Sequence, residues 1–266
     1  MFIDAIGTRH AIAPPNARII SLVPSLTELL FDLSLGPQIV GRTSFCIHPQ
    51  PDVKMIKSVG GTKRINYNKL QESAPDYVLL NIDENPKELA AEITNMGINV
   101  IVTHPVKVSD NRSLYRLIGG IFNRIEEAEG LVQKFNMALS SLQQTARSIR
   151  PSQVLYIIWR DPWMTITNTT YIADFLTQVN WQVTPQTDDS RYPTFTLSET
   201  ELDQYDLVLF SSEPYAFDQT HIDAFRKQHP RHASKAYLID GEMTSWYGSR
   251  AIKGLAYLAS FSKATI

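Results

Sequence analysis

Apolar runs rich in Val, Ile and Leu alternate along the chain with segments whose apolar positions recur every three or four residues. The first pattern is typical of buried strands and the second of amphipathic helices. Strands that alternate with helices predict a mainly parallel, doubly wound α/β sheet whose strands end at one shared edge. In residues 1–122 the expected strands are 18–23, 38–43, 77–81 and 99–103, and the expected helices are 25–36, 67–73, 86–96 and 110–122.

The same plan recurs after residue 150. Two segments have the spacing of a capping box, in which a serine is followed three residues later by a glutamate: Ser25 with Glu28, and Ser198 with Glu201. We therefore expect a helix to begin at each serine, and Ser245 to cap the last helix. The strands expected in this second half are 154–159, 207–210 and 236–239, and a further helix is expected at 170–178.

A proline-free segment from Arg124 to Arg147 lies between the two patterns and carries one apolar stripe at helical spacing. A helix of about 25 residues spans roughly 37 Å, which is enough to connect two lobes without a flexible linker. The alternative is an ordinary packed helix inside one larger domain. We expect an N-terminal α/β lobe at 1–122, a connecting backbone helix at 123–150, a C-terminal α/β lobe at 151–266, and a ligand cleft between the lobes.

Composition excludes several classes of protein. The 266 residues carry a formal net charge of −2, so no basic surface for nucleic acid is indicated. No apolar run approaches the roughly 18 residues that a membrane span needs. Cys46 is the single cysteine, so no internal disulfide can form. The amino terminus lacks the pattern of an export signal, which leaves two alternatives: a cytoplasmic protein, or one whose leader has been removed.

Polar and aromatic side chains gather where the expected strands end. Ligands of open α/β sheets bind beyond these ends, and a cleft for a small molecule is usually lined by aromatic side chains with a few polar groups. Strand-to-helix loops are polar in any case, so the aromatic residues are the stronger signal. The candidate ligand-binding residues are Ser25, Phe45, His48, Asn81, Glu84 and His104 in the first lobe, and Arg160, Trp163, Tyr215, Trp246, Tyr247 and Arg250 in the second.

Cys46 and His48 are candidate metal ligands, but they supply only two, whereas a zinc site made by the protein needs three or four. His104 or Glu84 could complete such a set. A metal held mainly by its own chelator, with one imidazole as an additional ligand, is the more economical hypothesis. Catalysis has no positive support, because the chain has neither Gly-x-Ser-x-Gly nor His-Glu-x-x-His.

Several motifs occur in the order found in a known family. The chain resembles the helical-backbone (class III) substrate-binding proteins, which are the receptors of ABC importers for vitamin B12, haem and ferric siderophores. The cobalamin-binding members look nearest, partly through Phe45-Cys-Ile-His-Pro and Ser211-Ser-Glu-Pro-Tyr. The other matching segments are Arg18-Ile-Ile-Ser-Leu-Val-Pro-Ser-Leu-Thr-Glu28, Val40-Gly-Arg-Thr, Val59-Gly-Gly, Ala74-Pro-Asp-Tyr-Val-Leu, Met96-Gly-Ile-Asn-Val and Trp246-Tyr-Gly-Ser-Arg250.

The resemblance implies two Rossmann-like lobes, one long rigid helix and a non-catalytic receptor outside the cytoplasm, without an intrinsic cofactor and expected to be monomeric. The ligand would be a metal chelate: a corrinoid such as cobalamin is favoured over haem or a ferric siderophore. Trp163, Tyr215, Trp246 and Tyr247 would offer stacking surfaces. His48 or His104 would reach the metal, and Arg160 or Arg250 would pair with acidic groups of the ligand.

The family also implies docking to an ABC permease through one glutamate near a helix start on each lobe. Glu199 or Glu201 fits this role in the second lobe, whereas the matching stretch of the first lobe has Asn68 and no acid. A competing hypothesis is a cytoplasmic enzyme or metallochaperone that handles metal ions or chelates through Cys46 and His48. A third is an interaction protein that has kept the fold and lost the ligand.

Overall fold

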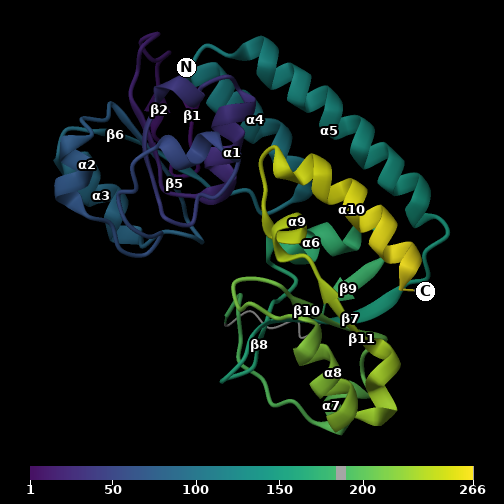
Figure 1. The fold of residues 1–266 in the computed structure, drawn as a ribbon. Helices are drawn as coiled ribbons and strands as arrows, with labels where there is room; N and C mark the ends of the chain where they lie inside the picture. Colours follow the sequence, from purple (N-terminus) through teal and green to yellow (C-terminus); the bar gives the residue numbers. More distant parts are fainter. Residues whose placement is uncertain (184–189, 266) are drawn as a thin grey trace. The chain divides into compact units, whose positions relative to one another are not determined.

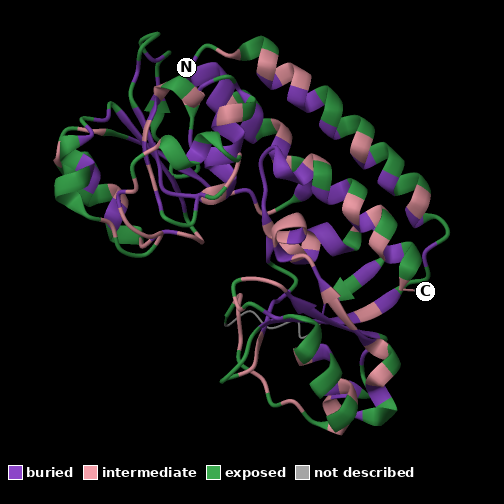
Figure 2. Cartoon of the chain, in the orientation of Figure 1, coloured by how far each residue is buried: buried purple, intermediate pink, exposed green. Residues whose placement is uncertain are grey.

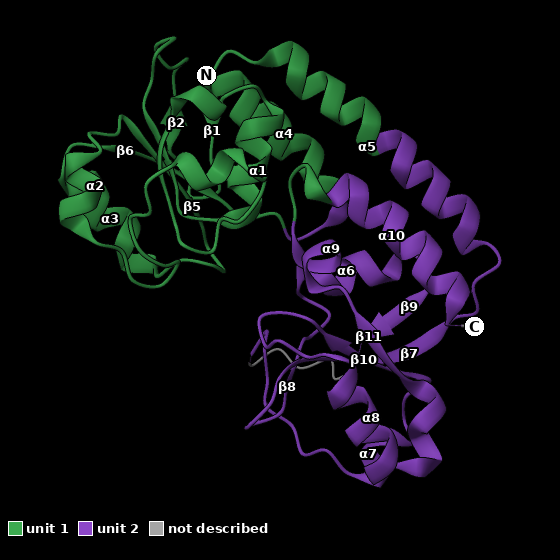
Figure 3. Ribbon diagram, viewed as in Figure 1, with its two compact units in different colours: residues 1–105, 109–135, 247–250 green, residues 106–108, 136–246, 251–266 purple. Residues whose placement is uncertain are grey.

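The structure is a computed structural model, and it describes residues 1–183 and 190–265. The chain forms two compact units, coloured separately in Figure 3. Helix α5 (Ile125–Ala146) contributes its first part to unit 1 and the remainder to unit 2. Unit 1 comprises Met1–Pro105, Ser109–Phe135 and Tyr247–Arg250, and unit 2 comprises Val106–Val108, Asn136–Trp246 and Ala251–Ile266.

Unit 1 is built on a four-stranded sheet in the order β4-β3-β5-β6, with every neighbouring pair parallel. This confirms the parallel arrangement expected from the alternating pattern (Figure 1). The strands are β1 (Phe2–Ile3), β2 (Arg9–His10), β3 (Ile19–Ser21), β4 (Ile39–Arg42), β5 (Tyr77–Asn81) and β6 (Asn99–Thr103). The helices are α1 (Pro24–Asp32), α2 (Tyr67–Glu72), α3 (Lys87–Asn95) and α4 (Asn111–Ile121), with short 3₁₀ turns η1 (Gly36–Gln38), η2 (Asp52–Met55) and η3 (Val108–Asp110).

The core of unit 1 lies on the sheet, whose central strands are buried (Figure 2). Successive side chains of a strand point to opposite faces. Val78 and Leu80 of β5 therefore share one face, where they pack with Leu70 of α2 and Ile93 of α3. Between them lies Leu79, which is also fully buried, so the sheet is covered on both faces as parallel sheets usually are.

Unit 2 contains a mixed sheet in the order β11-β10-β7-β8, and β9 also pairs with β7. Among the described strands of this sheet, β8 alone runs antiparallel to its neighbour. The strands are β7 (Ser152–Trp159), β8 (Met164–Thr165), β9 (Trp181–Val183), β10 (Leu207–Ser211) and β11 (Ala236–Ile239). The helices are α6 (Tyr171–Thr177), α7 (Glu199–Leu202), α8 (Gln219–Gln228), α9 (Gly241–Ser245) and α10 (Arg250–Ala264), with the 3₁₀ turn η4 (Pro230–Lys235).

Two predicted helix starts are wrong. Helix α1 begins at Pro24, with Val23 as its N-cap, and no side chain caps it. Proline suits the first helical position because its missing N–H would have no partner there. Ser245 ends α9 instead of capping the last helix, and α10 begins at Arg250. Gly248 lies between them with φ +74°, a conformation that interrupts a helix and favours glycine.

Two other helix starts have side-chain caps. Ser198 accepts a hydrogen bond from the backbone N–H of Glu201 at 3.2 Å, which confirms that α7 begins there. The start of α8, which the pattern did not predict, has a complete capping box in which His221 takes the place usually held by Glu or Gln. Of the helices in the described residues, none is both long and apolar enough to cross a lipid bilayer.

Candidate ligand-binding site

The strand ends of unit 1 form a polar cluster that begins at Asn81, the last residue of β5. Asn81 Oδ1 accepts from the backbone N–H of Asp83 at 2.8 Å, and the Asn81 N–H donates to Asn85 Oδ1 at 2.9 Å. Asn85 Nδ2 also donates to the carbonyl of Thr62 at 2.8 Å. These bonds fix residues 81–85 against the loop at 60–63. The buried Asn81 therefore shapes the loop that carries Glu84.

Within this cluster, the charge of Glu84 affects the pKa of Tyr247. Burial, and next the negative charge of Glu84, raise the pKa of Tyr247 well above its usual value, whereas hydrogen bonding with Ser25 and Thr103 lowers it. Burial also raises the pKa of Glu84, and the neighbouring ammonium of Lys63 opposes that shift. Ser25, Glu84 and Tyr247, which were predicted as ligand residues from distant parts of the sequence, are therefore neighbours in unit 1.

The imidazole of His104 lies beside Asp83, with 3.5 Å between Nε2 and Oδ2. About a quarter of each side chain is exposed, so the carboxylate can orient the imidazole toward a ligand. His48 is also partly exposed. Phe45 is 60% exposed, and its ring lies next to Gly61, where an added Cβ would be 3.3 Å from the ring. The sequence reasoning missed Lys63 and Asp83 as site residues. Asp83 lies in the same loop as Asn81 and Glu84, whereas Lys63 lies in the loop at 60–63, which contacts that loop.

Cys46 is buried in unit 1 and faces two hydroxyl groups. Thr27 Oγ1 donates to its sulfur at 3.0 Å, and Thr43 Oγ1 lies 3.2 Å from it. Burial raises the pKa of the Cys46 thiol, which favours the thiol over the thiolate that binds metals. Among the described residues, no group of three or more His, Cys, Asp or Glu side chains is arranged to hold a metal ion. The predicted pair of Cys46 and His48 thus gains no third protein ligand there.

Aromatic side chains cover the corresponding strand ends of unit 2. The ring of Trp159, which is 39% exposed, meets the edge of Tyr215 at a centroid distance of 5.6 Å. Trp163 stacks on Phe217 at 6.3 Å with an interplanar angle of 5°. The guanidinium of Arg160 lies 5.8 Å from the Trp163 ring centre, within the range of a cation–π contact. Arg160, Trp163 and Tyr215 are thus held in one aromatic surface, together with Trp159.

Two other predicted ligand residues have partners inside their own unit. Trp246 is buried in unit 2, and its indole N–H donates to Glu213 Oε1 at 2.5 Å. Arg250 is buried in unit 1, and its Nε donates to Glu28 Oε2 at 2.7 Å. A stacking role for Trp246 and an anion-binding role for Arg250 stay predictions, and the observed contacts support structural roles for both.

The two candidate docking acids of unit 2 also have partners. Glu199 Oε1 lies 2.5 Å from His229 Nδ1, and its Oε2 lies 3.1 Å from His232 Nε2. The hydrogen bond with His229 is the main reason that the pKa of Glu199 is lowered. Glu201 accepts a bond from the Tyr205 hydroxyl at 2.8 Å. Docking through either acid stays a prediction.

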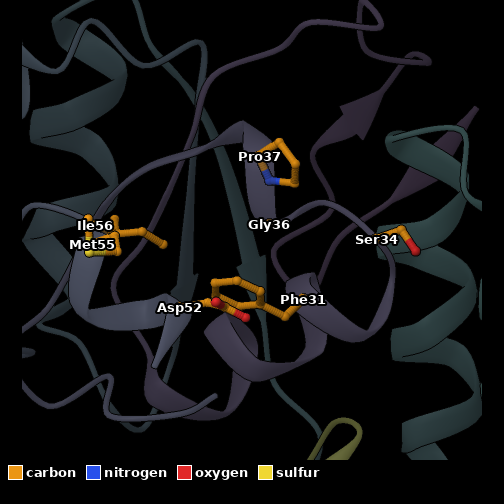
Figure 4. A pocket seen from close by; sticks show the side chains of 7 residues that line it. All are labelled: Phe31, Ser34, Gly36, Pro37, Asp52, Met55 and Ile56. Carbon is orange, nitrogen blue, oxygen red and sulfur yellow. The ribbon is translucent and has the colours of Figure 1, made fainter. Parts of the chain in front are cut away.

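A surface depression of about 590 Å³ lies in unit 1, and Figure 4 shows the side chains that line it. It is formed at the C-terminal end of α1, whereas the ligand edge of the sheet leads into the N-terminal end of that helix. None of the predicted ligand residues lines it. Its lining residues are Phe31, Ser34, Gly36, Pro37, Asp52, Met55 and Ile56.

The strands of unit 1 end in a polar cluster, and those of unit 2 end in an aromatic surface. Both agree with the polar and aromatic motifs that follow the expected strands in the sequence. Residues 19–236 match the periplasmic binding protein family. The chain belongs to this family. Membership supports a non-catalytic binding protein, in agreement with the expectation from the sequence.

Two solved structures of ligand-binding proteins have the same fold. The vitamin B12-binding protein BtuF of Vibrio cholerae superposes with a TM-score of 0.81, at 16% identity, over 94% of this chain and 97% of that one. The haem-binding protein RhuT from Roseiflexus sp. RS-1 superposes with a TM-score of 0.79, at 20% identity, over 94% of this chain and 99% of that one. At these identities the likeness establishes the fold.

Two relatives match this chain over a shorter length. A vitamin B12-binding protein of Pectobacterium carotovorum is 23% identical over 128 residues, which are 48% of this chain and 46% of that protein. YvrC, an uncharacterised ABC transporter substrate-binding lipoprotein of Bacillus subtilis, is 28% identical over 149 residues, which are 55% of this chain and 47% of that protein. The chain thus spans about half the length of these relatives.

Proposed function

We propose that the protein is the substrate-binding component of an ABC importer and binds a metal chelate, with a corrinoid such as cobalamin favoured over haem or a ferric siderophore. The observation that carries the proposal is the combination of the family fold with exposed aromatic rings at the strand ends of both units. Phe45 in unit 1 and Trp159 in unit 2 expose large apolar surfaces in places where ligands of parallel sheets bind. Flat chelates offer matching faces for such rings.

We assign ligand contact to Phe45, Glu84 and His104 in unit 1, and to Arg160, Trp163 and Tyr215 in unit 2. The buried Asn81 is assigned the role of shaping the loop that carries Glu84. Ser25 and Tyr247 lie near Glu84 and help to position it. His48 is a second candidate for the imidazole that binds the metal of the ligand. The partial exposure of His104 and its contact with Asp83 favour it as the imidazole that reaches the metal. A carboxylate partner of this kind sets the tautomer of a ligating histidine.

The proposed partner is a membrane permease, and the proposed location is outside the cytoplasm, as for the periplasmic or lipoprotein relatives. A monomer suffices for this role. Docking through Glu199 would require its carboxylate to exchange His229 and His232 for arginines of the permease. The alternative of a metallochaperone acting through Cys46 gains no support, because the thiol is buried and its pKa is raised.

Matched alanine variants test the assignment of the surface. Phe45→Ala and Met55→Ala each remove one exposed apolar side chain from unit 1, but Met55 lines the depression at the other end of α1. The proposal predicts that Phe45→Ala weakens chelate binding about tenfold in a calorimetric titration, which corresponds to about 1.4 kcal/mol. Met55→Ala should leave it unchanged. Equal affinities in both variants would contradict the assignment.

A further inference from the structure

Residues 2–10 of unit 1 form a hairpin with one inner and one outer face. β1 and β2 pair antiparallel, so that Phe2 lies opposite His10. This pair faces inward, because His10 is buried and the Phe2 ring fills the space that a Cβ at Gly120 would need. Successive residues of a strand point to opposite faces. The neighbouring cross-strand pair, Ile3 with Arg9, therefore faces outward.

Three isoleucines are exposed on and beside this hairpin. Ile3, Ile6 and Ile12 are 59%, 58% and 61% exposed, and Ile6 lies in the turn between the two strands. Arg9 is the one exposed charged side chain of residues 1–12, because the acid among them, Asp4, is buried. Ile3, Ile6, Ile12 and Arg9 are called the hairpin surface. It combines apolar groups with a single positive charge.

Every backbone N–H from Asp4 to Thr8 has a hydrogen-bond partner within unit 1. The carboxylate of Asp4 accepts from the N–H groups of Ile6 at 3.1 Å and Thr8 at 2.8 Å. The Gly7 N–H donates to the Asp4 carbonyl at 3.1 Å. The Asp4 N–H donates to the carbonyl of Thr8 at 3.0 Å, and the Ala5 N–H donates to a carbonyl of β6 at 2.9 Å. The turn is thus fixed in shape and attached to the sheet.

These internal bonds favour a lipid surface as the partner of the hairpin surface. An N–H without a partner is costly in the apolar part of a bilayer, because no water is there to accept from it. A protein interface instead uses about one hydrogen bond per 100–200 Å², and this turn has no N–H left to donate. In the part of the chain that the structure describes, no acid pairs with Arg9. Its charge is complementary to anionic headgroups.

We propose that the hairpin surface contacts a membrane surface that contains anionic lipids. Ile3 and Ile6 enter the boundary between headgroups and acyl chains, and the long side chain of Arg9 keeps its guanidinium at the level of the phosphates. The bonds of Asp4 hold the turn in this shape before contact, so that entry needs no refolding. Such a contact goes beyond the proposed function and does not require a bound chelate.

Co-sedimentation of the wild-type protein with lipid vesicles tests the contact. One myristoyl chain gives an association constant of about 10⁴ M⁻¹, and two isoleucine side chains bury fewer CH₂ groups, so we expect half of the protein to be bound at about 1 mM lipid. Vesicles of phosphatidylglycerol and phosphatidylcholine in equal parts should bind about fivefold more strongly than phosphatidylcholine alone. Equal binding to both, or none to either at about 10 mM lipid, would overturn the inference.

Two pairs of variants locate the contact. Ile3→Ser combined with Ile6→Ser should weaken binding to the mixed vesicles about tenfold, which corresponds to about 1.4 kcal/mol. Met137→Ser is the control, since Met137 is an apolar residue of α5 that is 74% exposed. Arg9→Gln should remove the preference for anionic vesicles, whereas Arg147→Gln, at another exposed arginine, should keep it. Unchanged binding by the double serine variant would reject the role of the isoleucines.

Fluorescence separates insertion of the turn from adsorption by charge. In Ile6→Trp, mixed vesicles should move the added emission to shorter wavelength, and brominated acyl chains should quench it. Unshifted emission from vesicle-bound protein would overturn the insertion of residue 6.

Sedimentation velocity without lipid examines a second copy of the chain as the occupant. We expect the wild-type protein and the double serine variant to sediment alike. A wild-type dimer that this variant does not form, without binding to vesicles, would make the hairpin surface an interface between two copies and overturn the membrane contact.

Discussion

Glu28 and Arg250 form a buried ion pair between residues 222 positions apart in the chain. Each side chain is 6% exposed, and 2.7 Å separates the Arg250 Nε from the Glu28 oxygen. Removing one member of a buried pair costs far more than removing both, because the remaining charge stays out of water. The pair fixes the start of α10 to α1 within unit 1.

Replacing Arg250 by methionine should therefore lower the free energy of unfolding of unit 1 by about 3–5 kcal/mol. The double variant Glu28→Met with Arg250→Met should recover most of the loss. Urea unfolding followed by near-ultraviolet circular dichroism measures both. Arg116→Met is the control, since its pair with Glu129 is well exposed and should matter much less. Similar losses in Arg116→Met and Arg250→Met would refute the role of burial.

Cys46 should react slowly with a thiol reagent in the native protein and rapidly once the chain is unfolded. The reason is that the thiol is buried and its pKa is raised, so little thiolate is presented to the reagent.

After loading with zinc or cobalt, elemental analysis should find no stoichiometric metal in either the wild-type protein or Cys46→Ala. Stoichiometric metal that disappears in Cys46→Ala would favour the metallochaperone instead.

Contacts between residues that are distant in the chain could not be predicted from local sequence patterns. The spacing of Ser25 and Glu28 predicts a capping box, but Pro24 starts the helix and Glu28 pairs with Arg250. The capping-box pattern considers only neighbouring positions, whereas the partner of Glu28 in the fold is Arg250, near the other end of the chain. The strand-end rule named Ser25, Glu84 and Tyr247 individually, and the fold brings these three residues together. Their role in ligand binding stays a prediction.

Among the elements, the central strands could be predicted well. β5 and β6 have the predicted bounds because their apolar runs are continuous and buried on both faces. β9 was missed because Trp181–Val183 is too short to show a period, and it is defined by its pairing with β7. Helix α8 was missed because its buried residues are sparse and its cap uses a histidine.

The cap of α8 provides a test of stability against pH. Hydrogen bonds with the Thr220 hydroxyl and with His221 lower the pKa of Asp218 from 3.8 to about 2. A carboxyl whose pKa is lower in the folded state stabilises it fully above its usual pKa, and the contribution is lost as the pH falls from about 3.8 to about 2.

Asp218→Ala should accordingly increase the exchange of α8 backbone amides at pH 7, and this difference from the wild-type protein should vanish near pH 2. Hydrogen exchange resolved by residue, together with a carboxyl titration by NMR, measures both effects. Asp223→Ala, in the middle of the same helix, is the control for removing one acid. If the α8 amides of Asp218→Ala still exchanged faster than those of the wild-type protein at the lowest pH, by the same factor as at pH 7, the capping role of Asp218 would be contradicted.

At the scale of the whole molecule, the sequence predicted two parallel-stranded α/β halves with a long helix between their patterns. It did not predict that Tyr247–Arg250 belongs to unit 1 although unit 2 segments flank it. Long-range bonds determine that assignment: the Gly248 N–H donates to Asn111 Oδ1 at 2.6 Å, and Tyr115 donates to the Gly248 carbonyl at 2.8 Å. Periodicity cannot reveal such pairs. The division into lobes at 1–122 and 151–266 with a connecting helix at 123–150 stays a proposal.

A receptor for metal chelates must bind its ligand saturably and without changing it chemically. A calorimetric titration of the wild-type protein with an amide-bearing corrinoid, accompanied by visible spectra, tests it most directly. We expect one ligand per chain with a dissociation constant below about 10 μM, equivalent to a binding free energy of roughly −7 kcal/mol. Neither heat nor a spectral change with this or any other metal chelate, at about 100 μM protein, would contradict it.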